Sequence, residues 1–211
     1  MGTAKACKLA EMFVMTIDQV ASRSRPDGVD SAIARLSHLD MDLAFERTAG
    51  DEFQGATSSA LSVVKAIVVL VEFPQWHIGT GVGAIEEMRV ASVRSGRGPA
   101  FLAARAALEG AKQSGAVTIA AGTVVGAADA ADATTAARLL TELIQRRSAD
   151  GREAVRQARS GASQATIAER LKISRQAVGQ RLAAARWQLQ APAEILLRRL
   201  LERTSGSSDG P

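Results

Sequence analysis

Residues 12–85 contain apolar segments in an order that few folds accommodate. Short alternating or continuous apolar runs indicate strands, and apolar residues at a spacing of three to four indicate helices. A turn at Ala49-Gly50 separates two alternating segments and predicts a hairpin. The predicted elements are a strand at 12–18, a helix at 29–39, strands at 43–48 and 51–56, a helix that residues 57–59 cap and that runs to about 72, and a strand at 76–85.

This order of strand, helix, strand, strand, helix, strand predicts an α+β fold with a split, ferredoxin-like sheet and both helices on one face. In such a sheet the end of the first strand lies beside the tip of the central hairpin. We therefore expect Asp18 to approach Asp51, although the two residues are far apart in the sequence.

The rest of the chain is expected to complete this first domain and to form a second, all-α domain. A helix from Gly98-Pro99 through Lys112, a strand near 117–120 and a helix at 132–147 complete a first domain at residues 1–147. Residues 148–203 form the second domain. The polar, glycine-rich residues 204–211 predict a disordered tail.

Asp51 and Glu52 stand side by side at the predicted hairpin tip. Two aspartates on adjacent backbone tips suit Mg²⁺ or Mn²⁺, hard cations that take oxygen ligands, and such a pair can grip a triphosphate. Gly50 lets a ligand approach the backbone. The alternative is a solvated turn. His38 and His77 have no partners at metal-ligand or triad spacing, which indicates structural or solvated side chains.

Two glycine-containing segments offer further ligand contacts. Gly79, Gly81 and Gly83 share one face of their strand, which is either bare for a ligand or packed closely against a helix. Residues 96–99 lead into a helix with proline at its first position, which favours anion binding. Arg97 and Arg105 could hold phosphates there, or be ordinary solvated arginines.

Four segments together resemble the nucleotidyl-cyclase superfamily: MTIDQVASR (15–23), FERTAGDEFQG (45–55), WHIGTGVGAIE (76–86) and GRGPAFLAAR (96–105). More closely, they resemble the SatD family of bacterial proteins, in which such a domain is often followed by a helix-turn-helix. The resemblance implies Asp18 and Asp51 as metal ligands, with a nucleotide and Mg²⁺ or Mn²⁺. The candidate nucleotide or phosphate contacts are Gly50, Glu52, Arg97 and Arg105.

The sequence departs from the enzymes of that superfamily at two points. Ala49-Gly50 replaces the two glycines that precede the acidic pair in GGDEF enzymes. Class III cyclases place an asparagine four residues before a transition-state arginine; Arg105 fits the arginine, but Phe101 replaces the asparagine. Loss of a positioning group slows catalysis by orders of magnitude. We therefore expect a domain that binds a nucleotide or metal without turnover, with a cyclase as the alternative.

Charge is distributed unevenly. Residues 1–145 hold 13 Lys/Arg against 16 Asp/Glu, whereas residues 146–203 hold 13 against 5. A basic final quarter indicates a polyanionic partner. The single cysteine, Cys7, excludes an internal disulfide and favours the cytoplasm. The apolar stretch 63–73 is shorter than the roughly 20 residues of a membrane span, so no membrane is expected.

Residues 163–187 carry the strongest functional signal. Ser163 and Ser174 stand where helix N-caps are needed, and Ile167, Ala168 and Val178 are spaced to form a shared core. Leu171 and Leu182 extend this core. The pattern resembles a helix-turn-helix of bacterial regulators, with Lys172 at a turn position where glycine is common.

A helix-turn-helix predicts particular contacts with double-stranded DNA. Arg175 and Gln176 would enter the major groove first, where arginine suits guanine and glutamine suits adenine. Arg170, Lys172 and Arg181 suit phosphates. The complete expected set is Arg170, Lys172, Ser174, Arg175, Gln176, Gln180 and Arg181. The alternative is a helical hairpin with a solvated basic face.

A last helix is expected to begin at Pro192 and to carry an apolar stripe of Ile195, Leu196, Leu200 and Leu201. The stripe either packs on its own chain or forms a homodimer. The sequence as a whole predicts a two-domain bacterial transcriptional regulator, whose first domain senses a nucleotide effector or acts as a scaffold. The alternatives are a metal-dependent nucleotidyl cyclase or related phosphotransferase with an accessory DNA-binding domain, and a pure interaction scaffold.

Overall fold

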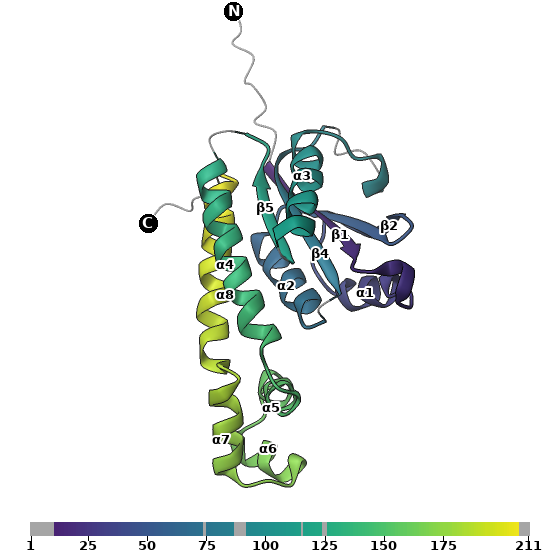
Figure 1. Cartoon of the computed structure of the whole chain (residues 1–211). Helices are drawn as coiled ribbons and strands as arrows, with labels where there is room; N and C mark the ends of the chain where they lie inside the picture. The colour runs from purple at the N-terminus through teal and green to yellow at the C-terminus, as the bar shows by residue number, and fades with distance from the viewer. Residues whose placement is uncertain (1–10, 74, 87–91, 115, 124–125, 207–211) are drawn as a thin grey trace, which may run out of the picture.

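The computed structural model describes residues 11–73, 75–86, 92–114, 116–123 and 126–206, and shows a mixed α+β protein. One sheet has the strand order β2-β3-β1-β4-β5. β1 is antiparallel to β3 and β4, β2 is antiparallel to β3, and β5 is parallel to β4 (Figure 1). The strands are β1 (Glu11–Gln19), β2 (Leu43–Ala49), β3 (Glu52–Thr57), β4 (Trp76–Ala84) and β5 (Val117–Ala121).

The helices that the sequence predicts occur in the expected order, with differences at some ends. They are α1 (Val29–Leu36), α2 (Ala60–Val71), α3 (Pro99–Ser114), α4 (Ala127–Gln145), α5 (Ala149–Arg159), α6 (Gln164–Leu171), α7 (Arg175–Ala184) and α8 (Trp187–Thr204), with 3-10 turns at Ser22–Ser24 and Val93–Ser95. α4 begins earlier than expected, and α8 continues through Thr204 into the predicted tail. Cys7 and residues 207–211 of the tail lie outside the described residues.

The two faces of the sheet bury different side chains of β1. Phe13, Met15 and Ile17 point into the main core, which α1, α2, α4 and α8 cover. Met12 and Val14 point to the opposite face, where Ala100 and Ala104 of α3 complete a smaller core. The alternation of side chains along one strand thus explains why helices cover both faces.

The glycines of β4 are required by the close approach of α3. A Cβ atom added to Gly79 would lie 2.3 Å from the backbone nitrogen of Leu108, and one added to Gly81 would lie 2.1 Å from the carbonyl oxygen of Ala100. Any side chain at these two positions would overlap the helix backbone. Close helix packing is therefore the correct interpretation of this glycine face, and the idea of a bare ligand-binding face is wrong.

α4 and α8 lie side by side along the main core (Figure 1). The start expected for α8 at Pro192 is wrong: the helix begins at Trp187 and contains Pro192 within its first turns. The residues of its predicted apolar stripe differ in burial. Leu200 and Leu201 are buried in the main core, whereas Ile195 and Leu196 are about half exposed, at 51% and 53%.

α5, α6 and α7 form a small lobe at the far end of the α4–α8 pair (Figure 1). This lobe has a core of its own, with Ile167, Ala168 and Val178 buried. The other described residues form what we call the body. Within the described residues, no helix is both long and apolar enough to span a membrane.

Candidate nucleic-acid interface and aspartate cleft

Two serines fix the starts of α6 and α7. The Ser163 hydroxyl accepts a hydrogen bond from the Thr166 backbone N–H at 3.2 Å, and the Ser174 hydroxyl accepts one from the Ala177 N–H at 3.1 Å. Each serine satisfies a backbone donor that a helix start leaves without a partner. The hydroxyl of Ser174, which the sequence assigns to DNA contact, is thus used for capping.

Lys172 makes the turn between the two helices. It adopts the left-handed conformation, with φ of 53° and ψ of 45°, at the end of α6. This is the conformation for which glycine is usually selected, and it explains the expectation of glycine at this position. The Ile173 N–H then donates to the Ala168 carbonyl at 3.0 Å, which closes the turn.

The inner faces of α6 and α7 pack against each other and exclude solvent. Ile167 and Val178 are fully buried, and Ala168 is 8% exposed. Leu171, Ile173 and Leu182 are half-buried and pack around them. Because these apolar side chains occupy the facing sides of both helices, the remaining surface of α7 is fixed in orientation.

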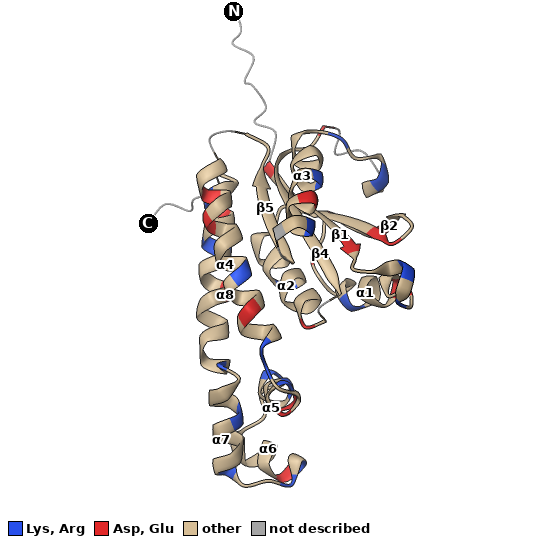
Figure 2. Ribbon diagram, viewed as in Figure 1, with Lys and Arg blue, Asp and Glu red and all other residues tan. Residues whose placement is uncertain are grey.

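The outer face of α7 presents polar side chains to solvent. Arg175, Gln176 and Gln180 are exposed, as is Lys172 in the turn. None of the four side chains has a hydrogen-bond or ion-pair partner among the residues that the structure describes. Figure 2 shows basic residues at this end of the lobe. Their terminal donors are therefore available to an external acceptor.

Two predicted phosphate contacts have partners inside the lobe. Arg170 donates to the Gln157 side-chain oxygen at 2.8 Å, and Arg181 forms a 2.8 Å ion pair with Asp150. Both interactions hold α5 against the other two helices. A phosphate would have to replace these acceptors, so Lys172 is better placed than Arg170 or Arg181 for that role.

The structure brings Asp18 and Asp51 together, as the strand order predicts. Both line an open cleft of about 430 Å³ at one end of the sheet, with His77 and Lys112 on its other walls. The Gln19 N–H donates to the Asp51 carbonyl at 3.3 Å, which ties the end of β1 to the hairpin tip.

A lysine ammonium, rather than a third carboxylate, faces Asp18. The Lys112 Nζ lies 3.6 Å from Asp18 Oδ2. Burial raises the pKa of the Asp18 carboxyl, the Lys112 charge opposes that rise, and the Asp51 charge adds to it. Among the described residues, no three His, Cys, Asp or Glu side chains are grouped to hold a metal ion. Asp18 and Asp51 are the carboxylates that the sequence assigns to a metal, and the expected metal stays a prediction.

None of the other predicted nucleotide contacts lines this cleft, although Gly50 and Glu52 flank Asp51 at the hairpin tip. Gly50 forms the hairpin turn with φ of 56°, and Glu52 accepts a hydrogen bond from Thr48 at 2.9 Å. Arg97 pairs through its backbone with Glu86, beyond the opposite end of β4. Arg105 is exposed on α3 and does not line the cleft.

Phe101, at the asparagine position of the cyclases, belongs to the small core between α3 and the sheet. A Cβ atom on Gly96 would lie 2.0 Å from the Phe101 ring, so the ring occupies the space beside that glycine. Phe101 therefore has a packing role in this chain, which agrees with its apolar chemistry.

His77 and Lys112 are cleft residues that sequence reasoning missed. His77 is the direct cross-strand neighbour of Asp18. Its Nδ1 atom is buried and has no hydrogen-bond partner among the described residues. The register of β1 against β4 would have indicated this proximity, but periodicity within one strand does not fix a register.

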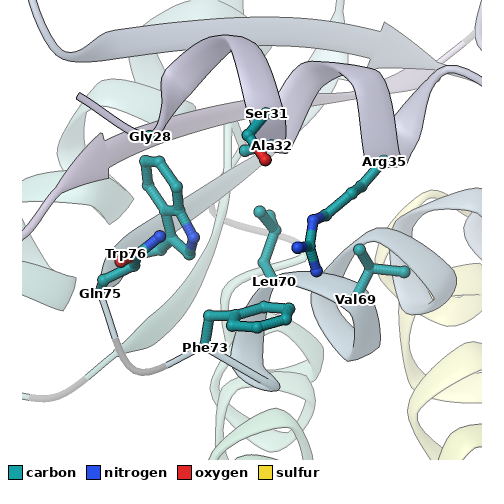
Figure 3. A pocket seen from close by; sticks show the side chains of 9 residues that line it. All are labelled: Gly28, Ser31, Ala32, Arg35, Val69, Leu70, Phe73, Gln75 and Trp76. Atoms are coloured by element: carbon teal, nitrogen blue, oxygen red, sulfur yellow. The ribbon is translucent and has the colours of Figure 1, made fainter. Parts of the chain in front are cut away.

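A further cavity lies between α1 and the end of α2 (Figure 3). Its volume is about 80 Å³, which is smaller than the several hundred Å³ typical of ligand pockets. On its wall, the Arg35 guanidinium lies 4.2 Å from the centre of the Phe73 ring. This cavity has room for water but not for a nucleotide.

No protein-family model matches the sequence, and no curated protein is significantly similar to it.

Proposed function

We propose that this chain is a bacterial DNA-binding transcriptional regulator that acts in the cytoplasm. In this proposal α6 and α7 form a helix-turn-helix, and the sheet with α1, α2 and α3 is a ferredoxin-like, cyclase-type domain of the kind that the SatD resemblance implies. The body serves as a sensor or scaffold. The strand order β2-β3-β1-β4 supports the ferredoxin-like part.

One observation carries the DNA-binding proposal. Val178 is fully buried on one side of α7, while Arg175 and Gln176 are exposed on the other. Burial of the inner face fixes the helix, and its N-terminal end remains free to enter a major groove. This is the geometry by which a recognition helix reads base edges.

The exposed side chains then have distinct roles. The Arg175 guanidinium can donate two hydrogen bonds to one guanine, and the Gln176 amide can pair with an adenine. Gln180, one turn further along α7, reaches a following base pair or the backbone. Lys172 neutralises a phosphate and fixes the register of the lobe on the duplex.

A homodimer fits this function, because helix-turn-helix proteins commonly read paired half-sites. Ile195 and Leu196 are about half exposed on α8, on the helix that continues from α7 toward the body. Contact between two copies through these side chains would set the spacing of the two recognition helices.

The proposal is tested by titrating the full chain into labelled double-stranded genomic fragments and measuring fluorescence anisotropy. We expect binding that weakens steeply with salt, as phosphate contacts require. Replacing Arg175 and Gln180 together with glutamate should abolish it. Arg94→Glu is the matched control, because Arg94 is an exposed arginine beside β2. Binding that survives the double change would reject α7 as the interface.

A nucleotidyl cyclase is the second candidate, and the shared cleft of Asp18 and Asp51 favours it. The test is incubation with ATP or GTP and Mn²⁺, followed by chromatographic detection of a cyclic product. A product that is lost in Asp51→Asn would make the protein an enzyme. We expect none, since Lys112 faces Asp18 and Phe101 replaces the asparagine.

A further inference from the structure

A second, larger cleft separates the body from the lobe. Its volume is about 510 Å³, within the usual range of ligand pockets. The body contributes the ends of α2 and α4, and the lobe contributes α5. The lining residues are Glu72, Phe73, Ile144, Gln145, Arg147, Ala149, Arg152, Glu153, Arg156 and Arg159.

The cleft carries more positive than negative charge. Of its four arginines, Arg159 pairs with Glu72 at 2.5 Å, and Arg156 pairs with Glu153. These two pairs use both carboxylates of the lining. Figure 2 shows basic residues at the connection from α4 to α5 and on α5 itself.

Arg147 and Arg152 have no carboxylate partner among the described residues. Arg147 is 5% exposed, and it donates to the Ala185 carbonyl at 3.0 Å and to the Gln190 side-chain oxygen at 2.8 Å. Arg152 donates to the Arg147 carbonyl at 2.5 Å. All of these acceptors are neutral, so neither guanidinium forms an ion pair with a described residue.

The surroundings of Arg147 make this charge costly. Burial lowers the pKa of its guanidinium, and the nearby Arg159 charge adds to the effect, against the opposing charges of Glu72 and Glu194. A buried cation whose hydrogen-bond acceptors are all neutral is unfavourable, and an anion in the cleft would add to the partial compensation by the two glutamates. Arginine donors also match phosphate oxygens in geometry.

We propose that the cleft between α2, α4 and α5 binds a small multivalent oxyanion of the phosphate class, held by the exposed Arg152 and attracted by the charge of the buried Arg147. The exposed side of Phe73 and the buried Ile144 provide an apolar wall beside the charged one. A bound anion contacts both the body and the lobe at once. The assignment does not depend on whether the lobe binds DNA.

The test is calorimetric titration of the full chain with inorganic tripolyphosphate at low ionic strength. We expect one binding event. Arg152→Ala should weaken it by at least about tenfold, because a hydrogen bond to a charged group is removed. Glu153→Gln should tighten it by up to about threefold, because it removes a competing carboxylate. Thermal unfolding of each variant, followed by circular dichroism, confirms that the fold is retained.

Two further variants separate this cleft from other basic surfaces. Arg94→Ala should leave the affinity unchanged, because Arg94 is exposed on the segment beside β2. Arg175→Ala reports on the outer face of α7. The proposal is overturned if Arg152→Ala retains the wild-type affinity, or if Arg175→Ala weakens tripolyphosphate binding as much as Arg152→Ala does.

A parallel titration with ATP distinguishes an organic phosphate from the inorganic anion, since both ligands carry a triphosphate. Tighter binding of ATP, with the excess affinity lost in Phe73→Ala, assigns a phosphate ester whose organic part lies on the Phe73 ring. Equal affinities of the two ligands assign the inorganic group alone.

Discussion

Arg159, the last residue of α5, forms an ion pair with Glu72 at the end of α2, with 2.5 Å between Nη1 and Oε1. The pair joins two elements that are far apart in the sequence and lie in different parts of the molecule. It therefore links the lobe that carries α7 to the body. Both side chains are partly exposed, at 39% and 32%.

Removing this link should change the motion of the lobe more than the stability of the chain. An exposed ion pair contributes at most about 1 kcal/mol, so Glu72→Gln should change the free energy of unfolding by less than that. We expect faster amide hydrogen exchange in α5, while exchange in the sheet stays unchanged. Glu169→Gln, a change within the lobe, serves as the control. Unchanged exchange in α5 would show that Glu72 does not restrain the lobe.

Replacing Lys172 with glycine should raise the stability of the fold and lower its affinity for DNA. Because its φ of 53° is unfavourable for a side chain with a Cβ atom, Lys172→Gly should raise the free energy of unfolding by up to about 1 kcal/mol. The same change removes a phosphate contact, so DNA affinity should fall for every sequence, and the salt slope should fall by about one. Denaturant unfolding and anisotropy titrations measure the two effects. Lys172→Ala should reduce affinity without stabilising the fold; a gain in stability there would reject the backbone argument.

Gly81 should tolerate no side chain. A Cβ atom there would lie 2.1 Å from the Ala100 carbonyl oxygen, so Gly81→Ala must push α3 away from the sheet. We expect a loss of at least about 3 kcal/mol in urea unfolding. Gly83→Ala is the matched control on the same strand and face, where the nearest atom would be 3.3 Å away. Equal losses in the two variants would contradict the close approach of α3 at Gly81.

Asp18 should destabilise the fold at neutral pH. Its pKa in the folded protein lies above the ordinary 3.8, because burial outweighs the Lys112 charge. The protonated form therefore stabilises the fold, a contribution that is complete below pH 3.8 and is lost as the pH rises through the folded-state pKa. Asp18→Asn, which stays neutral, should be more stable than wild type at pH 7, and the difference should shrink at about pH 3. Urea unfolding at both pH values measures this. A less stable Asp18→Asn at pH 7 would mean that the contact with Lys112 dominates.

Local patterns in the sequence were sufficient to predict the order of the elements, the helix caps at Ser163 and Ser174, and the proximity of Asp18 to Asp51. Each of these depends on spacing within one segment or on the order of strands. The contact between Lys112 and Asp18 could not be predicted, because it depends on how far α3 extends along the sheet. The start of α8 was missed because proline usually stands in the first turn of a helix, whereas Pro192 is the sixth residue of α8.

The choice between the two meanings of the β4 glycines also required the structure. A glycine face leaves space either for a ligand or for a backbone, and the sequence does not specify which one occupies it. Likewise, Arg147 is an ordinary arginine in the sequence. Only the structure shows that it is buried between α4 and α5 and bonded to Ala185 at the end of α7 and Gln190 in α8.

The central claim, that the exposed end of α7 reads DNA sequence, is tested most directly by selecting bound duplexes from a random library with the wild type and with Arg175→Ala. We predict a defined motif for the wild type, and for Arg175→Ala a loss of preference at one base pair with a cost of about 1–3 kcal/mol. Lys172→Ala should weaken all sequences equally and leave the motif intact. A wild type without sequence preference, or an Arg175→Ala variant that weakens all sequences equally, would contradict the account.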